Sequence, residues 1–195
     1  MRSCTKADKD KVVKIIAESF DTNPSVNRVI KNDHKRKERI KALAGYSFKT
    51  ALSRDGAYFS SDEQGVALCY QYNIKKEGLS DYWNQFLLVF RVIGFSRVMS
   101  IMKRDAFLKS QRPKNGNYLY FWFLGITDKG KGGIAIRELK EAVFSESKKK
   151  QLPIYLETSV PKNKRVYERY EFITYNEWKD PETGDVIWLM RRDAK

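Results

Sequence analysis

The stretch YLYFWFLGITDKGKGGIA, residues 118–135, decides the fold of this 195-residue chain. Residues 118–127 form a run rich in apolar, aromatic and β-branched side chains, which is typical of a buried strand. Gly130, Gly132 and Gly133 follow and open a segment with the apolar spacing of a helix. Glycines at such a junction let a ligand approach the backbone, and the free N–H groups of the first helical turn favour a phosphate. The stretch therefore predicts a strand, a pyrophosphate-binding turn and a helix in succession.

Three other interpretations of these glycines are weaker. A simple tight turn rarely needs three glycines in four positions. A P-loop needs Ser or Thr after its Gly-Lys pair to hold magnesium, whereas Gly132 follows Lys131. The dinucleotide fingerprint is matched by Gly130, Gly132 and Ala135, with Glu157 near the place of the acidic ribose ligand. However, only one short helix and an antiparallel hairpin are expected after Glu157, and a doubly wound sheet needs further parallel strands.

Hydrophobic periodicity and turn residues predict the elements around this stretch. We expect a capped helix that starts behind Thr5 and Asp8 and stops at Asn23-Pro24. The other expected elements are a helix over 35–52, a hairpin of 57–60 with 66–72, two helices over 79–111 broken near Gly94, a strand over 153–158, a helix over 163–170, and a terminal hairpin of 172–178 with 186–190. No stretch has the composition of a linker, so one domain over residues 1–195 is predicted.

The order and spacing of these pieces resemble the Gcn5-related N-acetyltransferase (GNAT) superfamily. That family has a motif strand, then Q/R-x-x-G-x-G/A at a helix start, a second strand, an Asn ahead of a Tyr, and Gly-Phe. The corresponding pieces here are residues 118–127, residues 130–135, residues 154–159, Asn163 with Tyr167, and Glu171-Phe172. The resemblance implies an α/β (α+β) fold in which helices flank a mixed, mostly antiparallel sheet. Residues 73–117 lie outside it and are expected to form a helical insertion between the third and fourth strands.

Two positions depart from the family pattern. Gly130 stands where the family usually has Gln or Arg, and Lys129 and Lys131 are the nearby side chains that would substitute for it. Glu171 replaces the glycine before Phe172, at a turn position. Neither change removes a catalytic group.

The resemblance implies an acetyl-CoA-dependent N-acyltransferase (EC 2.3.1) in which an acceptor amine attacks the thioester directly. Tyr167 would protonate the leaving thiolate, and Asn163, about one helical turn away, would bond the pantetheine arm. Glu157 is the best candidate for a general base, but a solvent-exposed or structurally paired carboxylate is at least as good an interpretation, and water or a neutral amine would make a base unnecessary. The residues implied at the cofactor are Leu124, Ile126, Lys129, Gly130, Lys131, Gly132, Gly133, Ile134, Ala135 and Asn163, with Leu124 and Ile126 acting through their backbone groups.

Two non-catalytic functions are alternatives to the acetyltransferase, and the first of them rests on the net charge. The formal net charge of +14 predicts attraction to a polyanion. The basic residues form separate clusters, and no nucleic-acid-binding motif accompanies them, so a nucleic-acid-binding protein is the weaker hypothesis. The other alternative is an acyl-CoA-binding sensor that has kept the fold and lost the chemistry.

Composition also bears on metals and location. Two cysteines and one histidine are too few for a disulfide framework or a zinc cluster, so we expect no metal. No apolar run has the length of a membrane span and the first residues do not resemble a secretion signal, so we expect a cytoplasmic protein without membrane contact. Three uses of the insertion stay open: a roof over the acceptor pocket, an extension of the core, or a homodimer contact. The acceptor amine itself has no signature in the sequence.

Overall fold

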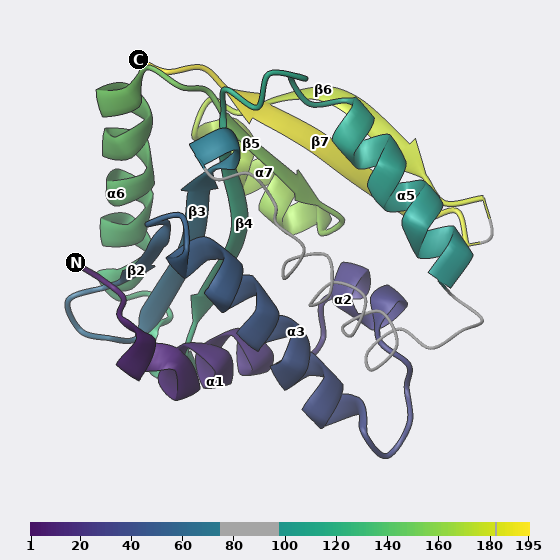
Figure 1. Cartoon of the computed structure of the whole chain (residues 1–195), viewed down its shortest axis with the longest axis horizontal. Coiled ribbons are helices and arrows are strands. Elements are labelled where there is room, and N and C mark those ends of the chain that lie inside the picture. Colours follow the sequence, from purple (N-terminus) through teal and green to yellow (C-terminus); the bar gives the residue numbers. More distant parts are fainter. Residues whose placement is uncertain (75–97, 182) are drawn as a thin grey trace.

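A single seven-stranded sheet forms the centre of the computed structural model, which describes residues 1–74, 98–181 and 183–195 (Figure 1). The strands are β1 (Arg2–Ser3), β2 (Ala57–Phe59), β3 (Gly65–Gln71), β4 (Leu119–Ile126), β5 (Ile154–Thr158), β6 (Ile173–Lys179) and β7 (Val186–Arg192). Their order across the sheet is β1-β2-β3-β4-β5-β7-β6. Neighbouring strands are antiparallel except β4 and β5, which run parallel. The predicted mixed, mostly antiparallel sheet is confirmed.

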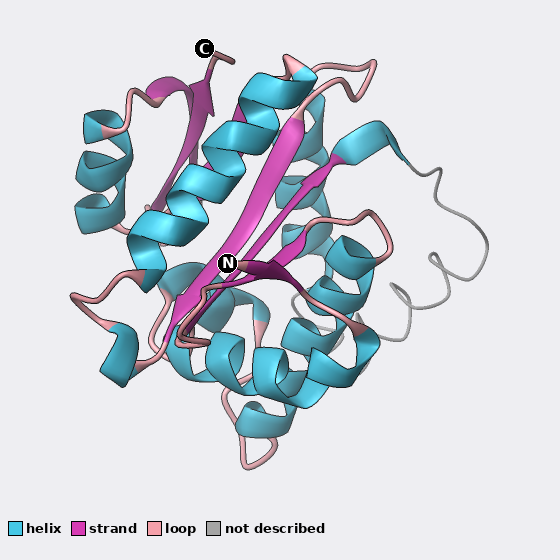
Figure 2. Cartoon of the chain, turned by 90° about the vertical axis from the view of Figure 1, so that its left-hand side faces the viewer, coloured by secondary structure: helices cyan, strands magenta, loops and turns pink. Residues whose placement is uncertain are grey.

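Helices cover both faces of this sheet. α1 (Lys9–Ser19) and α3 (Arg36–Leu52) bury apolar side chains on one face, in a core that includes Val12, Ile16 and Phe48. α6 (Ala135–Lys150) packs on the opposite face, where Leu139 and Val143 join buried residues of the central strands. Figure 2 shows α6 crossing in front of the strands. This layered arrangement matches the predicted fold class.

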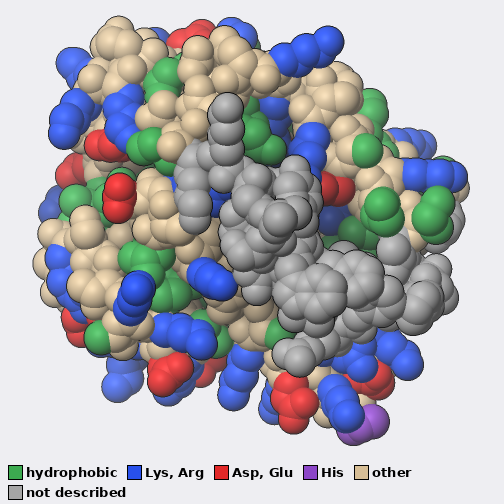
Figure 3. All heavy atoms as spheres, viewed as in Figure 1, with side chains coloured by type: hydrophobic (Ala, Val, Ile, Leu, Met, Phe, Trp, Pro, Cys, Tyr) green, Lys and Arg blue, Asp and Glu red, His purple; other side chains and the backbone are tan. Residues whose placement is uncertain are grey.

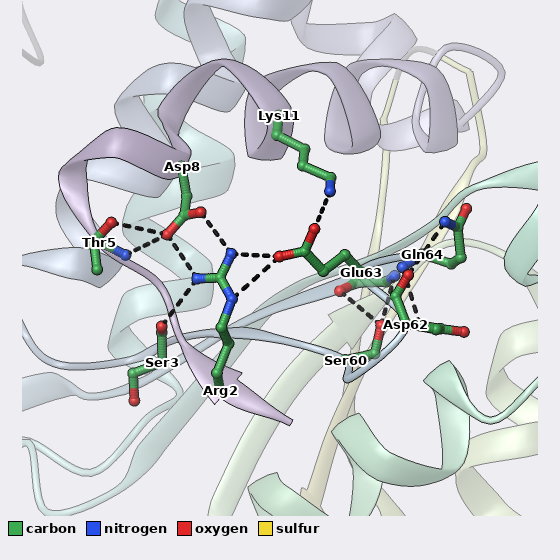
Figure 4. A network of polar contacts seen from close by, with 10 residues as sticks. Arg2, Ser3, Thr5, Asp8, Lys11, Ser60, Asp62, Glu63 and Gln64 are labelled. Atoms are coloured by element: carbon green, nitrogen blue, oxygen red, sulfur yellow. Dashed lines mark hydrogen bonds and ion pairs between the residues drawn. The ribbon is translucent and has the colours of Figure 1, made fainter.

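An ionic network holds the first residues against the sheet (Figure 4). Arg2 donates to Asp8 at 2.7 and 2.9 Å and to Glu63 at 2.7 Å, and Lys11 also donates to Glu63. The backbone N–H of Thr5 donates to Asp8 at 2.7 Å, so the capping box predicted at these two residues is confirmed. The hydrogen bonds from Arg2 hold the pKa of the Asp8 carboxyl well below its usual range. The network joins β1, the start of α1 and the turn between β2 and β3.

Two elements are absent from the sequence prediction: β1 and a short helix, α2 (Pro24–Val29). β1 has two residues, too few for an alternating pattern to appear. The sequence predicts that the first helix stops at Asn23-Pro24, but α1 already ends at Ser19, and Asn23-Pro24 instead starts the next helix. The Asn23 side chain accepts the N–H groups of Ser25 and Val26, and Pro24 occupies the first turn, where no N–H is needed.

The insertion between β3 and β4 is described in part. Its second predicted helix is present as α5 (Val98–Ser110). Leu108 of this helix packs with Ile187 and Leu189 of β7, so α5 covers the β6–β7 side of the sheet. The first predicted helix falls within residues 75–97 and lies outside the described residues.

A gap opens in the middle of the sheet between β4 and β5. The two strands pair at Leu119 with Ile154 and at Tyr120 with Tyr155, and no further pair joins them in the described part of the chain. β5 continues along β7 as far as Thr158. The parallel strands therefore diverge toward their carboxyl ends, and the carboxyl-terminal half of β4 lacks a neighbour on that side.

Candidate active site

The open edge of β4 is the first component of the site. In an antiparallel pair, the backbone groups of successive residues point alternately toward and away from the partner strand. Thr127 donates to Gln64 on the β3 side at 2.9 Å, so the N–H and C=O groups of Ile126 and Leu124 point to the side that β5 leaves open. Both residues line a cleft at this gap. They are the two positions whose backbone groups the family resemblance implies at the cofactor.

One hydroxyl group already satisfies part of this edge. Ser19, the last residue of α1, accepts the N–H of Ile126 and donates to the C=O of Ile126, each at 3.0 Å. The Ser19 oxygen thus takes the place of a neighbouring strand at Ile126. Sequence patterns do not reveal this residue, because the pairing joins positions 107 residues apart.

The cleft lies where β4 and β5 diverge, and it has a volume of about 1340 Å³. Pockets for one small molecule usually measure roughly 300–1,000 Å³, so this cleft has room for two substrates. One end, which we call the α6 end, lies at the start of α6 and includes Lys131 and Lys140. The other, the α5 end, lies between α2, α3 and α5 and includes Val29, Leu43 and Ile101. Figure 1 shows that α6 and α5 stand on opposite sides of the molecule.

A glycine-containing turn forms the α6 end. Asp128–Gly130 make one 3₁₀ turn, capped by the Thr127 hydroxyl, which accepts the N–H of Gly130 at 3.1 Å. Gly130 packs against Gln64 so closely that a Cβ would lie 2.7 Å from the Gln64 Cβ. Gly132 has a φ of 77°, in the left-handed region that favours glycine. The first glycine is thus required for packing and the second for the turn.

The helix behind this turn is suited to an anion. α6 starts without a side-chain cap at Ile134, so its first N–H groups are available to a ligand. Lys131 lines the cleft beside it and pairs with Asp128 at 2.5 Å. Of the residues implied at the cofactor, Leu124, Ile126, Lys131 and Asn163 line the cleft, Lys129, Gly132, Gly133 and Ile134 are exposed, and Gly130 and Ala135 are buried.

Asn163 and Tyr167 come from α7 (Pro161–Arg169), the helix that follows β5. Both line the cleft, so the structure brings them together with Leu124 and Ile126. Tyr167 is half-buried and packs edge-on against Phe172, with ring centroids 5.5 Å apart. Burial raises the pKa of Tyr167 to about 12. Its phenol therefore stays protonated near neutral pH and can donate a hydrogen bond into the cleft.

The turn after α7 explains how Glu171 can stand where the resemblance has glycine. Glu171 adopts a φ of 66°, the left-handed conformation that glycine adopts without strain. The N–H of Phe172 donates to the C=O of Tyr167 at 3.1 Å, which closes the turn. Arg192 and Lys195 pair with the Glu171 carboxylate at 3.3 and 3.0 Å. The turn geometry is thus kept despite the substitution.

Glu157 lies in the cleft wall with both carboxylate oxygens engaged. Arg112 donates to Oε1 from Nε at 3.0 Å and from Nη2 at 2.8 Å, and the Tyr120 hydroxyl donates to Oε2 at 2.9 Å. The Arg112 guanidinium stacks on the Tyr120 ring at 4.0 Å. Burial raises the pKa of Tyr120 well above its ordinary value, so this hydroxyl remains a donor. The geometry favours the structurally paired interpretation of Glu157 that the sequence left open.

Arg112 and Tyr120 are site residues that the sequence analysis does not select. Arg112 lies two residues after α5 and meets Glu157 across 45 positions of the chain. Tyr120 lies in the motif strand, where an aromatic residue is typical of any buried strand. Neither residue has a spacing that would distinguish it from a structural one.

Surface charge does not gather at one place on the visible face. Figure 3 shows Lys and Arg side chains spread across it, with acidic side chains between them. Among the described residues, no group of three or more His, Cys, Asp or Glu is placed to hold a metal. No helix in the described ranges is long and apolar enough to cross a membrane.

Comparisons with known sequences give one partial match. No protein-family model matches the chain. Over 103 residues, 53% of this chain, it is 26% identical to an uncharacterized N-acetyltransferase of Schizosaccharomyces pombe. The match covers 36% of that protein, so the chain spans about a third of the curated relative's length.

Solved structures extend the likeness over the whole chain. The histone acetyltransferase HPA2 and related acetyltransferase from Corynebacterium glutamicum has a TM-score of 0.71 at 17% identity, covering 100% of this chain and 95% of that one. Arylalkylamine N-acetyltransferase 2 from Aedes aegypti has a TM-score of 0.71 at 13% identity, covering 100% and 98%. The C-terminal condensation domain of Ebony, solved with beta-alanyl-dopamine, has a TM-score of 0.70 at 15% identity, covering 98% and 97%. At these identities the comparison shows a shared fold.

Proposed function

The chain has the fold of the GNAT superfamily, and on that premise we propose that it is an acetyl-CoA-dependent N-acyltransferase that acetylates an amine. One observation carries this proposal. The open backbone edge of β4 leads directly into the uncapped start of α6, while Asn163 and Tyr167 line the same cleft from the β5 side.

The residues present fit an acyl-CoA. The N–H and C=O groups of Leu124 can pair with an extended amide chain in the way that a neighbouring strand would, and those of Ile126 can do so when Ser19 releases them. The first N–H groups of α6, with Lys131 nearby, suit a pyrophosphate. Asn163 supplies an amide that can both donate and accept. The bound co-substrate would supply an acetyl group activated as a thioester.

The reaction requires four changes that balance. The acceptor nitrogen bonds to the acetyl carbon, the carbon–sulfur bond breaks, the nitrogen loses a proton, and the sulfur gains one. The protein contributes mainly by holding the amine and the carbonyl in a productive geometry and by placing donors where charge develops. The backbone edge of β4 provides such donors.

Tyr167 is our proposed general acid. A phenol with a pKa of about 12 is fully protonated at neutral pH, so the donor is always present when a negative charge develops on sulfur. Its position one turn after Asn163 on α7 places both groups on the same wall of the cleft.

We propose that Glu157 holds Arg112 and Tyr120 in place and does not act as a general base. Its contacts with Arg112 and Tyr120 leave neither oxygen without a donor, and removal of a proton from the amine would compete with those bonds. We therefore propose that water or the neutral form of the acceptor makes a dedicated base unnecessary. A general-base role for Glu157 stays a prediction.

An activity assay tests the proposed function. The protein is mixed with acetyl-CoA and a panel of amines that includes arylalkylamines, polyamines, amino acids and lysine peptides. We expect amine-dependent release of free thiol, an acetylated product by mass spectrometry, and a higher melting temperature with CoA. Absence of both turnover and CoA stabilisation overturns the proposal. Stabilisation without turnover indicates the acyl-CoA-binding sensor instead.

A further inference from the structure

The α5 end of the cleft contains an arginine that forms no ion pair in the part of the chain that the structure describes. Arg104, on α5, lines the cleft and is half-buried. Its Nε and Nη1 atoms are buried, and neither has a hydrogen-bond partner within the part of the chain that the structure describes. Burial lowers the pKa of its guanidinium, although an arginine remains charged at neutral pH. The cleft therefore presents a charged guanidinium with two donor atoms, Nε and Nη1, that no described residue accepts.

Acidic side chains near Arg104 are already engaged elsewhere. Glu157 accepts from Arg112 and Tyr120, as described above. Asp105, the next residue on α5, pairs with Lys109 at 3.1 Å. Arg28, a second cation whose charge reaches Arg104, pairs with Asp180 and Asp185. Among the described residues, Asp105 and Glu157 act on Arg104 only through their charge, which raises its pKa, and neither accepts a hydrogen bond from its buried Nε or Nη1.

An unpaired guanidinium in a partly dry cleft is costly to the free protein. Removing a charge from water without a partner is unfavourable, and buried charges in proteins are normally paired. The contrast with Arg112 is informative, because that nearby guanidinium has two hydrogen bonds to a carboxylate and an aromatic ring beneath it. Such a cost is expected where a residue must be ready for a ligand.

The surroundings of Arg104 limit what the ligand can be. Val29, Leu43 and Ile101 make the nearby wall apolar, and Tyr46 lines the same region. Phosphate-binding features lie at the α6 end instead, where the helix start and Lys131 are found. A ligand group that bound Arg104 would thus belong to the acceptor rather than to the co-substrate. It would combine an anion with an apolar body.

We propose that Arg104 binds a carboxylate on the acceptor, so that the preferred substrates are amines that also carry a carboxylate and an apolar side chain. Amino acids such as phenylalanine and leucine are the simplest members of this class. A planar guanidinium binds a carboxylate with two parallel hydrogen bonds, which fixes the orientation of the amine as well as its affinity. This inference rests on the proposed acetyltransferase function and specifies its acceptor.

Matched pairs of amines test the inference. Phenylalanine is compared with phenethylamine, leucine with isopentylamine, and O-phosphoethanolamine with ethanolamine. We expect kcat/KM to be about ten- to hundredfold higher for the carboxylate member of the first two pairs, the range of one charge-assisted hydrogen-bonded contact. In Arg104→Met this ratio falls toward one. In the control Lys103→Met, which removes an exposed charge from the same helix, the ratio is unchanged.

Two further measurements keep the outcomes distinct. Removing Arg104 should leave the melting temperature of the free protein unchanged or raise it; a clear fall would show that an acid of the chain itself neutralises Arg104, which overturns the inference. Stabilisation by N-acetylphenylalanine but not by N-acetylphenethylamine, lost in Arg104→Met, supports the subsite even without turnover. If CoA binds and amines react but the ratio is one in the wild type, or if the phosphate pair shows the larger ratio, the inference fails while the proposed function stands.

Discussion

The α6 end and the α5 end of the cleft are built from different parts of the chain. At the α6 end, the backbone of β4, a glycine turn and a helix start provide the polar groups. At the α5 end, side chains provide them: Arg112 and Tyr120 around Glu157, and Arg104, whose Nε and Nη1 have no hydrogen-bond partner among the described residues. The difference shows that a site formed by backbone groups can be predicted from a short stretch of sequence. A site formed by side chains depends on contacts between residues that are far apart in the sequence.

The largest expected effect concerns the paired arginine. Arg112→Met leaves the Glu157 carboxylate, whose side chain is only 10% exposed, without its cation, so the free energy of unfolding should fall by about 3 kcal/mol. Urea denaturation measures this loss. Arg104→Met is the matched variant, with the same chemical change at an arginine that makes no ion pair within residues 1–74, 98–181 and 183–195, and should show no such loss. Equal losses would contradict the contrast between these two arginines.

The next effect tests the proposed acid on α7. Tyr167→Phe removes one hydroxyl, and kcat should fall about a hundredfold if that group protonates the sulfur. CoA affinity, measured by calorimetry, should change less than about twofold, because the ring and its packing on Phe172 remain. Because the pKa of Tyr167 is about 12, ionisation of this residue should not reduce the wild-type rate between pH 7 and roughly 10. Tyr170→Phe, in the same cleft wall, is the control; a similar loss there would argue against a specific acid.

A smaller effect is expected at the hydroxyl that completes β4. Ser19→Ala leaves the N–H and C=O of Ile126 without a partner, which should lower the free energy of unfolding of the free protein by about 1–2 kcal/mol. CoA should then raise the melting temperature of the variant more than that of the wild type, since the ligand replaces the lost bonds. Ser110→Ala, which removes a hydroxyl bonded to Phe107 at the end of α5, is the control. Weaker stabilisation by CoA in Ser19→Ala would contradict a backbone role for Ile126.

The smallest effect concerns two residues with positive φ, one at each end of α6, and is measured as a change in stability. At Gly132 a Cβ would meet no atom within 4 Å, so Gly132→Ala should cost about 1 kcal/mol through its positive φ alone. Gln151→Gly, at the other end of α6, should stabilise the protein by a similar amount of about 1 kcal/mol, because Gln151 has a φ of 53°. Thermal unfolding of both variants measures the two changes. Opposite signs are expected, and a large loss for Gly132→Ala would show that the turn tolerates no side chain.

Most of the fold was predictable because its elements have local signals. The motif strand, the glycine turn and the helix after it appear within residues 118–150, and β4, the turn and α6 follow that order. The family resemblance implied Asn163 and Tyr167 together, and both line the cleft from α7; their roles stay a prediction. β1 and α2 were not predictable, since one is two residues long and the other starts at Asn23-Pro24, where the sequence pattern predicts the end of the first helix.

Much of the site depends on contacts that sequence spacing does not encode. Ser19 meets Ile126 because α1 ends beside the gap in the sheet. Arg112 meets Glu157 because the insertion returns to β4 next to β5. Arg112 can therefore be identified as the partner of Glu157 only from the three-dimensional structure. The same holds for Arg104, whose significance is the lack of a partner among the described residues.

The gap between β4 and β5 also bears on self-association. A strand with unpaired N–H and C=O groups is a template for pairing with another chain, a hazard usually confined to the rims of sheets. Here the unpaired stretch lies in the centre of the sheet, where cleft walls and the Ser19 hydroxyl shield it. The cleft walls and Ser19 therefore protect this unpaired stretch from pairing with a strand of another chain. A ligand that fills the cleft should add to this protection and so reduce aggregation.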